Sequence, residues 1–166
     1  MTRRTSPAKV SGSGIFCLIV SEIVYQGTSA IALDAQGRIT VPVRQRELLM
    51  QACEGRLTLT KHPDGYLWVM PRERWEATRA RLLAMTMEAD PWRRILIGSA
   101  VDLEIDGAAR VLIPPELREA AGLTKDVLLI GNGRVLELWD ADRHRAHEAA
   151  LMAQPMPAEI RGLVLQ

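Results

Sequence analysis

The sequence predicts a mixed α+β fold, rich in β-strands, in which one small unit occurs twice and carries flanking helices. An internal repeat relates the two halves of the chain. Short runs of β-prone residues also alternate with tight-turn sequences. Each copy is too small to bury a hydrophobic core by itself, so we expect the two copies, or copies from neighbouring chains, to share one core.

The repeat has a spacing of 72 residues. It places Asp34 onto Asp106 and Arg38 onto Arg110, and apolar positions agree in the same register. Three further polar or proline pairs follow it: Pro42 with Pro114, Arg46 with Arg118, and Glu47 with Glu119. We predict a first repeat over residues 24–86, a helical connector over 87–98, a second repeat over 99–154 and a C-terminal tail over 155–166.

Residues 1–23 form a separate segment. Basic residues precede an apolar block over residues 15–20. This block is shorter than the core of a signal peptide, far too short to span a bilayer, and is followed by no small-residue cleavage site. We interpret residues 1–23 as a non-native or mis-annotated extension and expect the working chain to begin near Val24.

In the first repeat, residues 29–33 and 38–41 are β-prone runs on either side of a tight turn at residues 34–37. Asp34 opens this turn, and Gly37 can supply the positive φ that a hairpin requires. Pro42 fits the first position of a helix that reaches about Ala52. A second hairpin follows, with strands at 57–60 and 66–70, and then a helix over 72–85.

The second repeat has corresponding elements. We predict hairpin strands at 127–130 and 135–139, a helix over 141–152, and a further helix at 91–97 before the repeat begins. Its tight turn runs from Asp106 to Arg110, with Ala109 where the first turn has glycine. A positive φ at Ala109 would cost about 1 kcal/mol. We therefore expect this turn to be re-registered onto Gly107, and the aim of Arg110 is open.

Composition excludes several classes of protein. The 166 residues contain 21 Lys+Arg and 20 Asp+Glu, a net charge of +1, which argues against a basic tail protein and a disordered acidic one. The two cysteines form no CxxC pattern, so we expect neither a disulfide framework nor a structural zinc site, and a reducing cytosolic compartment is the default. No activated nucleophile is identifiable, so we expect no enzyme, no catalytic residue and no cofactor.

Two histidines, His144 and His147, share a face of a predicted helix. A metal pair would need further ligands, and the arginines beside them argue for a surface position, so no metal site is expected. The tryptophans are expected to anchor cores or subunit contacts, rather than to stack on bases.

Arginines provide the candidate functional site. Arg38 follows the first turn, and Arg44 and Arg46 lie in the first turns of the following helix, an arrangement suited to phosphate or guanine recognition. An equally weighted alternative for Arg38 is that Asp34 caps the turn and pairs with it, and that the pair holds the hairpin rather than a ligand. For Arg44, surface solvation is slightly favoured.

The two motifs differ in charge. Residues 34–47 contain three arginines and two acids, whereas residues 102–119 contain two arginines and five acids. We therefore expect the first repeat to be the stronger half for phosphate or guanine recognition.

The duplicated pattern D-x-x-G-R-[IV]-x-[VI]-P, together with L-T-L-T-K-H-P-D-G and R-x-x-W, resembles the MraZ family of bacterial transcriptional regulators from about Tyr25 to near the C-terminus. The resemblance implies two SpoVT-AbrB domains in a swapped-hairpin β-barrel pseudodimer, and a ring-shaped homo-oligomer. It also implies binding to short direct repeats in double-stranded DNA upstream of the division and cell-wall gene cluster. DNA contact transfers to Arg38 and Arg110, with Arg44, Arg46 and Arg118 as supporting residues.

These implications place the protein in the cytoplasm, associated with the nucleoid, with no membrane or small-molecule partner. Two alternatives stay open: an antitoxin-like AbrB-type regulator, and a ring-forming scaffold that binds proteins only.

Overall fold

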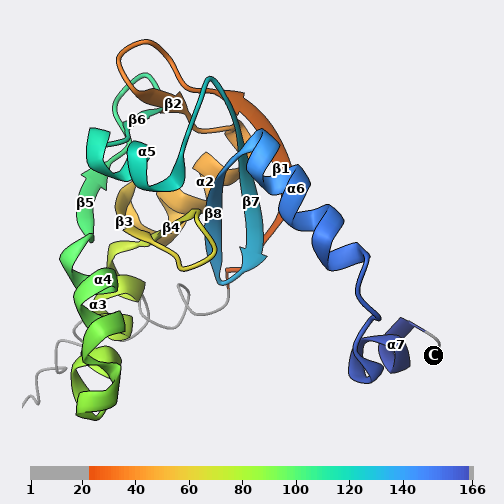
Figure 1. Cartoon of the computed structure of the whole chain (residues 1–166). Helices are drawn as coiled ribbons and strands as arrows, with labels where there is room; N and C mark the ends of the chain where they lie inside the picture. The colour runs from red at the N-terminus through yellow and green to blue at the C-terminus, as the bar shows by residue number, and fades with distance from the viewer. Residues whose placement is uncertain (1–22, 165–166) are drawn as a thin grey trace, which may run out of the picture.

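The structure is a computed structural model that describes residues 23–164 (Figure 1). The predicted extension lies outside the described residues, except for Ile23, which packs against the core. The first half of the chain contains β1 (Tyr25–Ala32), β2 (Arg38–Thr40), α2 (Val43–Cys53), β3 (Arg56–Lys61), β4 (Leu67–Pro71) and α3 (Arg72–Ala84). After a 3-10 turn, η1 (Met87–Ala89), the second half contains α4 (Asp90–Gly98), β5 (Val101–Glu104), β6 (Arg110–Leu112), α5 (Pro115–Ala121), β7 (Asp126–Gly133), β8 (Val135–Asp140), α6 (Ala141–Met152) and α7 (Ala158–Val164).

Strands from both repeats build one six-stranded sheet in the order β1-β7-β8-β4-β3-β5, and every neighbouring pair is antiparallel. The first strand of each repeat pairs with the hairpin of the other repeat: β1 with β7, and β5 with β3. A separate two-stranded ribbon joins β2 and β6. The mixed α+β prediction is therefore confirmed, with mostly antiparallel strands.

The main core lies between the sheet and the ribbon. It combines Leu57 and Leu59 from the first repeat with Leu129 and Leu136 from the second, all at most 2% exposed. The ribbon adds buried side chains from both of its strands. The two repeats thus share one core within a single chain, which is the first of the two alternatives that the sequence left open.

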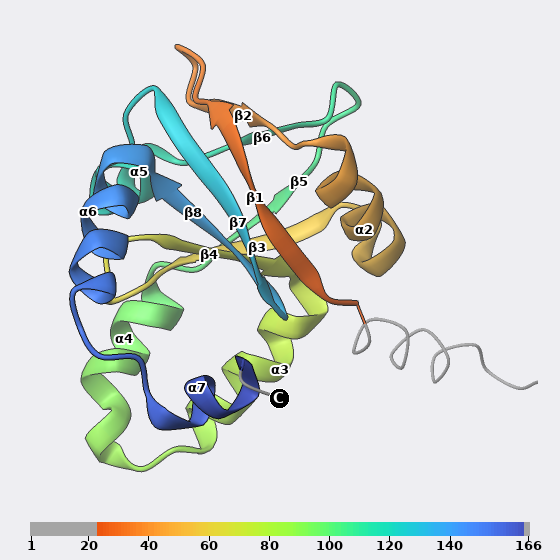
Figure 2. The same ribbon diagram turned by 90° about the vertical axis from the view of Figure 1, so that its right-hand side faces the viewer.

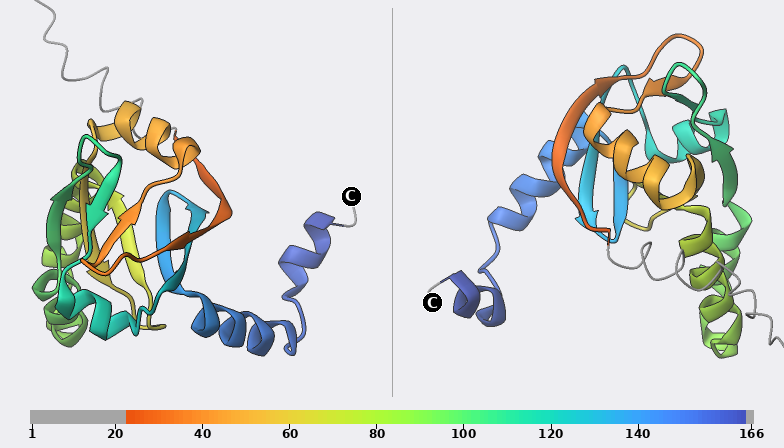
Figure 3. Two further views of the ribbon diagram at one scale, coloured as in Figure 1. Left: turned by 90° about the horizontal axis from the view of Figure 1, so that it is seen from above. Right: turned by 180° about the vertical axis from the view of Figure 1, so that it is seen from behind.

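A smaller cluster joins α3 and α4 to the sheet. Met70, Trp75, Leu82 and Leu96 are buried together in it. Figure 1 shows α3 and α4 below the sheet on the side away from α6, while the β2–β6 ribbon and α5 lie at the top. In Figure 2 the helix α2 flanks the ribbon on the other side from α6. The arm formed by the end of α6 and by α7 extends away from the rest of the molecule (Figure 3).

The element boundaries mostly match the predictions, and β1 differs most. It begins at Tyr25, four residues before the predicted start, and ends at Ala32. All eight residues pair with β7, from Tyr25 opposite Gly133 to Ala32 opposite Asp126. This partner is about a hundred residues away in the chain, so the pairing leaves no local signal in the Gln-Gly-Thr sequence that follows Tyr25. Within residues 23–164, none of the helices combines the length and the apolar character that crossing a membrane would require.

Asp140 closes the second hairpin and begins α6. Its Oδ1 accepts hydrogen bonds from the backbone N–H groups of Asp142 and Arg143, at 3.2 and 3.1 Å, which caps the helix. Its Oδ2 accepts from the backbone N–H and the hydroxyl of Thr124, at 3.0 and 2.7 Å. Asp140 is 4% exposed, so its carboxylate is satisfied by these protein donors and has little access to water.

Replacing Asp140 by alanine is expected to lower the free energy of unfolding by about 2–3 kcal/mol, because the helix loses its cap and Thr124 loses its acceptor. Urea denaturation followed by circular dichroism measures this. Asp142→Ala is the matched control: its carboxylate is exposed and, among residues 23–164, pairs only with Arg145, so the change should stay within about 0.5 kcal/mol. Equal losses from the two variants would contradict the capping role of Asp140.

Candidate nucleic-acid interface

The β2–β6 ribbon displays two arginines on one face. Arg38 lies opposite Leu112, Ile39 opposite Val111, and Thr40 opposite Arg110. Because paired residues share a face and successive residues alternate, Arg38 and Arg110 point away from the core together with Thr40 and Leu112. Ile39 and Val111 point inward and are buried. One face of the ribbon therefore packs on the core, and the other face exposes the two arginines.

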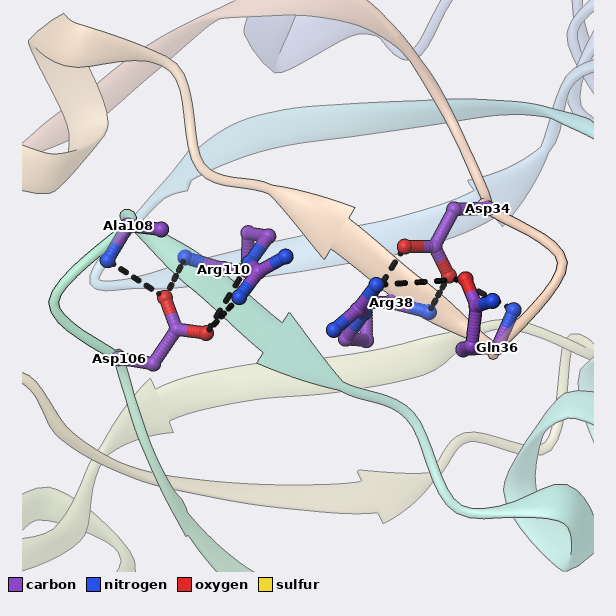
Figure 4. Close-up of polar contacts among 6 residues, drawn as sticks. All are labelled: Asp34, Gln36, Arg38, Asp106, Ala108 and Arg110. Atoms are coloured by element: carbon purple, nitrogen blue, oxygen red, sulfur yellow. Dashed lines mark hydrogen bonds and ion pairs between the residues drawn. The ribbon is translucent and has the colours of Figure 1, made fainter.

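The first turn is held by Asp34 (Figure 4). Its Oδ1 accepts from the backbone N–H groups of Gln36 and Arg38, at 2.9 and 2.8 Å, and its Oδ2 accepts from Arg38 Nε at 2.9 Å. The backbone hydrogen bond from Arg38 is the main reason that the pKa of Asp34 lies below its usual value. The pairing that the sequence analysis raised as an alternative role for Arg38 is thus present.

The second turn has the same shape. Asp106 Oδ1 accepts from the backbone N–H groups of Ala108 and Arg110, at 2.9 and 2.8 Å, and Oδ2 accepts from Arg110 Nε at 3.0 Å. As in the first turn, the backbone hydrogen bond from the arginine is the main cause of a lowered pKa, here that of Asp106.

The predicted re-registration onto Gly107 is wrong. Ala109 itself adopts the left-handed conformation, at φ 61°, as Gly37 does at 81°, whereas Gly107 does not. The hydrogen bonds to Asp106 require this turn shape, and they outweigh a penalty of about 1 kcal/mol for a left-handed alanine. Arg110 is consequently aimed as Arg38 is, and Figure 4 shows the two guanidinium groups side by side between the two aspartates.

Both arginines retain donors beyond their aspartates. Arg38 Nη2 donates to Gln36 Oε1 at 3.2 Å, and Arg110 Nη2 lies 3.0 Å from Asp106 Oδ2. Neither Nη1 makes a hydrogen bond to any residue in the 23–164 range. The side chains are 31% and 36% exposed. Each aspartate therefore fixes the orientation of a guanidinium group while leaving an edge of it available to an acceptor.

The three supporting arginines lie at different places relative to the two turns. Arg118, on α5, lies over the first turn: a Cβ added to Gly37 would be 2.7 Å from Arg118 Cζ. Arg44, on α2, is exposed, and its Nη1 is 3.4 Å from the position of a Cβ at Gly27 on β1. Arg46 is half-buried on the same helix. Arg118 thus connects the second repeat to the turn of the first.

Gly37→Ala is expected to lower the free energy of unfolding by about 1–2 kcal/mol, because alanine is strained at this φ and its methyl group would displace Arg118. In an Arg118→Ala background the cost should fall to about 1 kcal/mol, the strain alone. Denaturation curves of the four proteins give the coupling energy. The same cost in both backgrounds would show that Arg118 does not pack on Gly37.

Three residues on the exposed face were not predicted from the sequence. Gln36 accepts a hydrogen bond from Arg38, and Thr40 and Leu112 flank the arginines. Alternation along β2 and β6 would have placed Thr40 and Leu112 beside Arg38 and Arg110, once the two strands were known to pair. That pairing joins positions about 70 residues apart, and nothing in the local sequence specifies it.

The histidines of α6 are not simply on the surface, as the sequence suggested. Their rings lie 5.3 Å (His144) and 5.0 Å (His147) from the ring of the buried Trp139. They attach α6 to the sheet.

A sequence profile described as "MraZ protein, putative antitoxin-like" matches the chain twice, at residues 24–98 and 96–159. The chain belongs to the MraZ family. The two matches correspond to the two repeats, so the family domain occurs twice. "Transcriptional regulator MraZ" of Leptothrix cholodnii is 57% identical over 138 residues, which cover 83% of this chain and 94% of the relative.

Two further relatives carry the same name. The protein of Methylibium petroleiphilum is 53% identical over 141 residues, covering 85% of this chain and 97% of the relative. That of Burkholderia mallei is 52% identical over 138 residues, covering 83% and 97%. MraZ relatives are thus named as transcriptional regulators, not as enzymes, in agreement with the expectation from the sequence.

Proposed function

We propose that this MraZ chain is a sequence-specific DNA-binding transcriptional regulator. Its targets are short direct repeats upstream of the division and cell-wall gene cluster, which is its own operon. The observation that carries the proposal is the pair of aspartate-oriented arginines, Arg38 and Arg110, on the exposed face of one β-ribbon. A two-stranded ribbon fits the major groove, and a guanidinium group can donate two hydrogen bonds to the O6 and N7 of guanine.

The remaining arginines contribute phosphate contacts. Arg44 is exposed in the first turn of α2, where backbone N–H groups at the helix start add to its positive charge. Arg46 and Arg118 lie on α2 and α5, which follow the two ribbon strands. Phosphate contacts position the ribbon, whereas base contacts supply the specificity. The exchange of first strands between the repeats supports the swapped-hairpin pseudodimer that the family resemblance implies.

A ring of identical subunits increases the affinity for DNA, because each subunit alone binds DNA weakly. With a net charge of +1, one chain attracts DNA poorly, but a ring presents several ribbons at the spacing of repeated DNA boxes. Once one ribbon is bound, its neighbour experiences a high effective concentration of the next box. The protein acts in the cytoplasm, on the nucleoid.

The test is a gel-shift titration with the DNA upstream of the chain's own operon, compared with a shuffled duplex of equal length. We expect tighter binding to the upstream DNA, and affinity that falls at least about tenfold between about 50 and 200 mM salt. Salt-independent association, or equal affinity for both duplexes, would contradict the proposal.

Two other outcomes separate the alternatives. A scaffold that binds proteins only would shift neither duplex. An antitoxin-like regulator would bind the promoter of a toxin gene pair in preference to the cell-wall gene cluster.

A further inference from the structure

The exposed face of the β2–β6 ribbon differs between its two halves. It carries Arg38 and Thr40 from β2, and Arg110 and Leu112 from β6. The 72-residue repeat relates Arg38 to Arg110 and Thr40 to Leu112, so the arginines are equivalent while the other two side chains are not. The antiparallel register sets Leu112 opposite Arg38 and Thr40 opposite Arg110. One arginine therefore has an apolar neighbour, and the other has a hydroxyl-bearing one.

Leu112 is the large apolar side chain on this face, and it is 52% exposed. Its neighbours in the chain, Val111 and Ile113, are buried in the core at 2% and 0% exposure, so the core is filled without Leu112. A single leucine beside two guanidinium groups is too small a surface for a protein to dock on, because the apolar patches that proteins recognise are much larger. It is large enough to cover one methyl group.

The major groove offers one apolar group to such a side chain. Thymine projects its C5-methyl group into this groove, and the other three standard bases have no such group. Directly opposed residues of an antiparallel pair have Cβ atoms about 4.5–5.5 Å apart, which is less than two steps of about 3.4 Å along a DNA strand. When Arg38 binds O6 and N7 of a guanine, Leu112 consequently lies over a base pair at most about two steps from that guanine.

We propose that Leu112 recognises the C5-methyl group of a thymine close to the guanine that Arg38 binds. Thr40, beside Arg110, has a shorter side chain and a hydroxyl group, so the Arg110 half of the ribbon does not make an equal contact. The difference gives the ribbon a direction along the DNA. Two identical halves would suit an inverted repeat, whereas unequal halves suit a box that is repeated in one orientation.

The inference rests on the DNA-binding function proposed above, and small chemical changes in the upstream DNA test it with the full chain. In one box, 7-deazaguanine replaces each guanine in turn and removes the N7 acceptor. The guanine whose replacement weakens wild type but not Arg38→Ala is the one that Arg38 binds. Deoxyuridine then replaces each thymine and removes only the C5-methyl group.

By gel-shift titration, we expect wild type to lose about fourfold in affinity when deoxyuridine replaces one thymine near the Arg38 guanine. This factor corresponds to about 0.8 kcal/mol for one buried methyl-sized group. Leu112→Ala should bind the thymine and uracil duplexes equally and stay sensitive to 7-deazaguanine. The exchange variant Thr40→Leu/Leu112→Thr should move the uracil-sensitive position to the Arg110 side of the box. Both positions are exposed, so neither variant disturbs the core.

Three results would overturn the proposal. Wild type could be insensitive to the methyl group of every thymine in the box, Leu112→Ala could keep the uracil sensitivity of wild type, or the exchange variant could leave the sensitive position in place. In each case wild type still binds the upstream DNA more tightly than the shuffled duplex, so the DNA-binding function survives. Equal affinity of wild type for both duplexes would instead contradict the proposed function, and this inference with it.

Discussion

Arg38→Ala is expected to weaken binding to the upstream DNA about 10–100-fold, since one bidentate contact to guanine contributes about 1–3 kcal/mol of discrimination. Binding to a shuffled duplex should change much less, because that binding depends on phosphate contacts. Arg110→Ala should cost less than Arg38→Ala, since the first motif has a surplus of arginine and the second a surplus of acid. Gel-shift titrations of both variants on both duplexes measure these differences.

Arg145→Ala is the matched control for the loss of one positive charge. Arg145 lies on α6, is 76% exposed and pairs with Asp142, away from the ribbon. We expect unchanged affinity for both duplexes. The two turns share one geometry, so only their surroundings distinguish Arg38 from Arg110. Equal losses for the two variants would refute the dominance of the first repeat, and a loss for Arg145→Ala would refute the assignment of binding to the ribbon.

Gly131→Ala is expected to be the most destabilising single-methyl change that we identify, with a loss of about 3 kcal/mol or more. Gly131 lies opposite Gly27 where β7 pairs with β1. A Cβ at Gly131 would be 2.4 Å from the backbone N of Gln26 and 2.5 Å from the carbonyl carbon of Tyr25. These are backbone atoms in a paired strand, so the clash cannot be relieved by a side-chain rotation. We expect β1 to separate from the sheet at this point.

Urea denaturation measures the loss, and hydrogen exchange should show lost protection confined first to β1 and β7. Gly107→Ala is the control, because nothing lies within 4 Å of an added Cβ there and its φ is outside the left-handed region. The control should stay within about 0.5 kcal/mol of wild type. Wild-type stability in Gly131→Ala would contradict the close approach of the two strands.

Local signals were sufficient to predict the repeat, the hairpins, the helices up to α6 and the first aspartate–glycine–arginine turn, but not α7, which lies in the predicted C-terminal tail. Proline at the start of α2, glycine at positive φ and alternating apolar residues all act within a few residues of themselves. Residues 34–38 therefore predicted the first turn, whereas the pairing of Asp34 with Arg38 was one of two alternatives that the sequence left open.

The features that the sequence did not predict depend on pairing between residues that are far apart in the chain. Ala109 alone argues for a shifted turn, yet the three hydrogen bonds to Asp106 and the pairing of β6 with β2 hold it in the left-handed conformation. The early start of β1 depends on β7, and the shared face of Arg38 and Arg110 depends on strands some 70 residues apart. Such contacts stabilise the fold only when both strands are already positioned by the rest of the chain. The sequence of either segment alone therefore does not predict them.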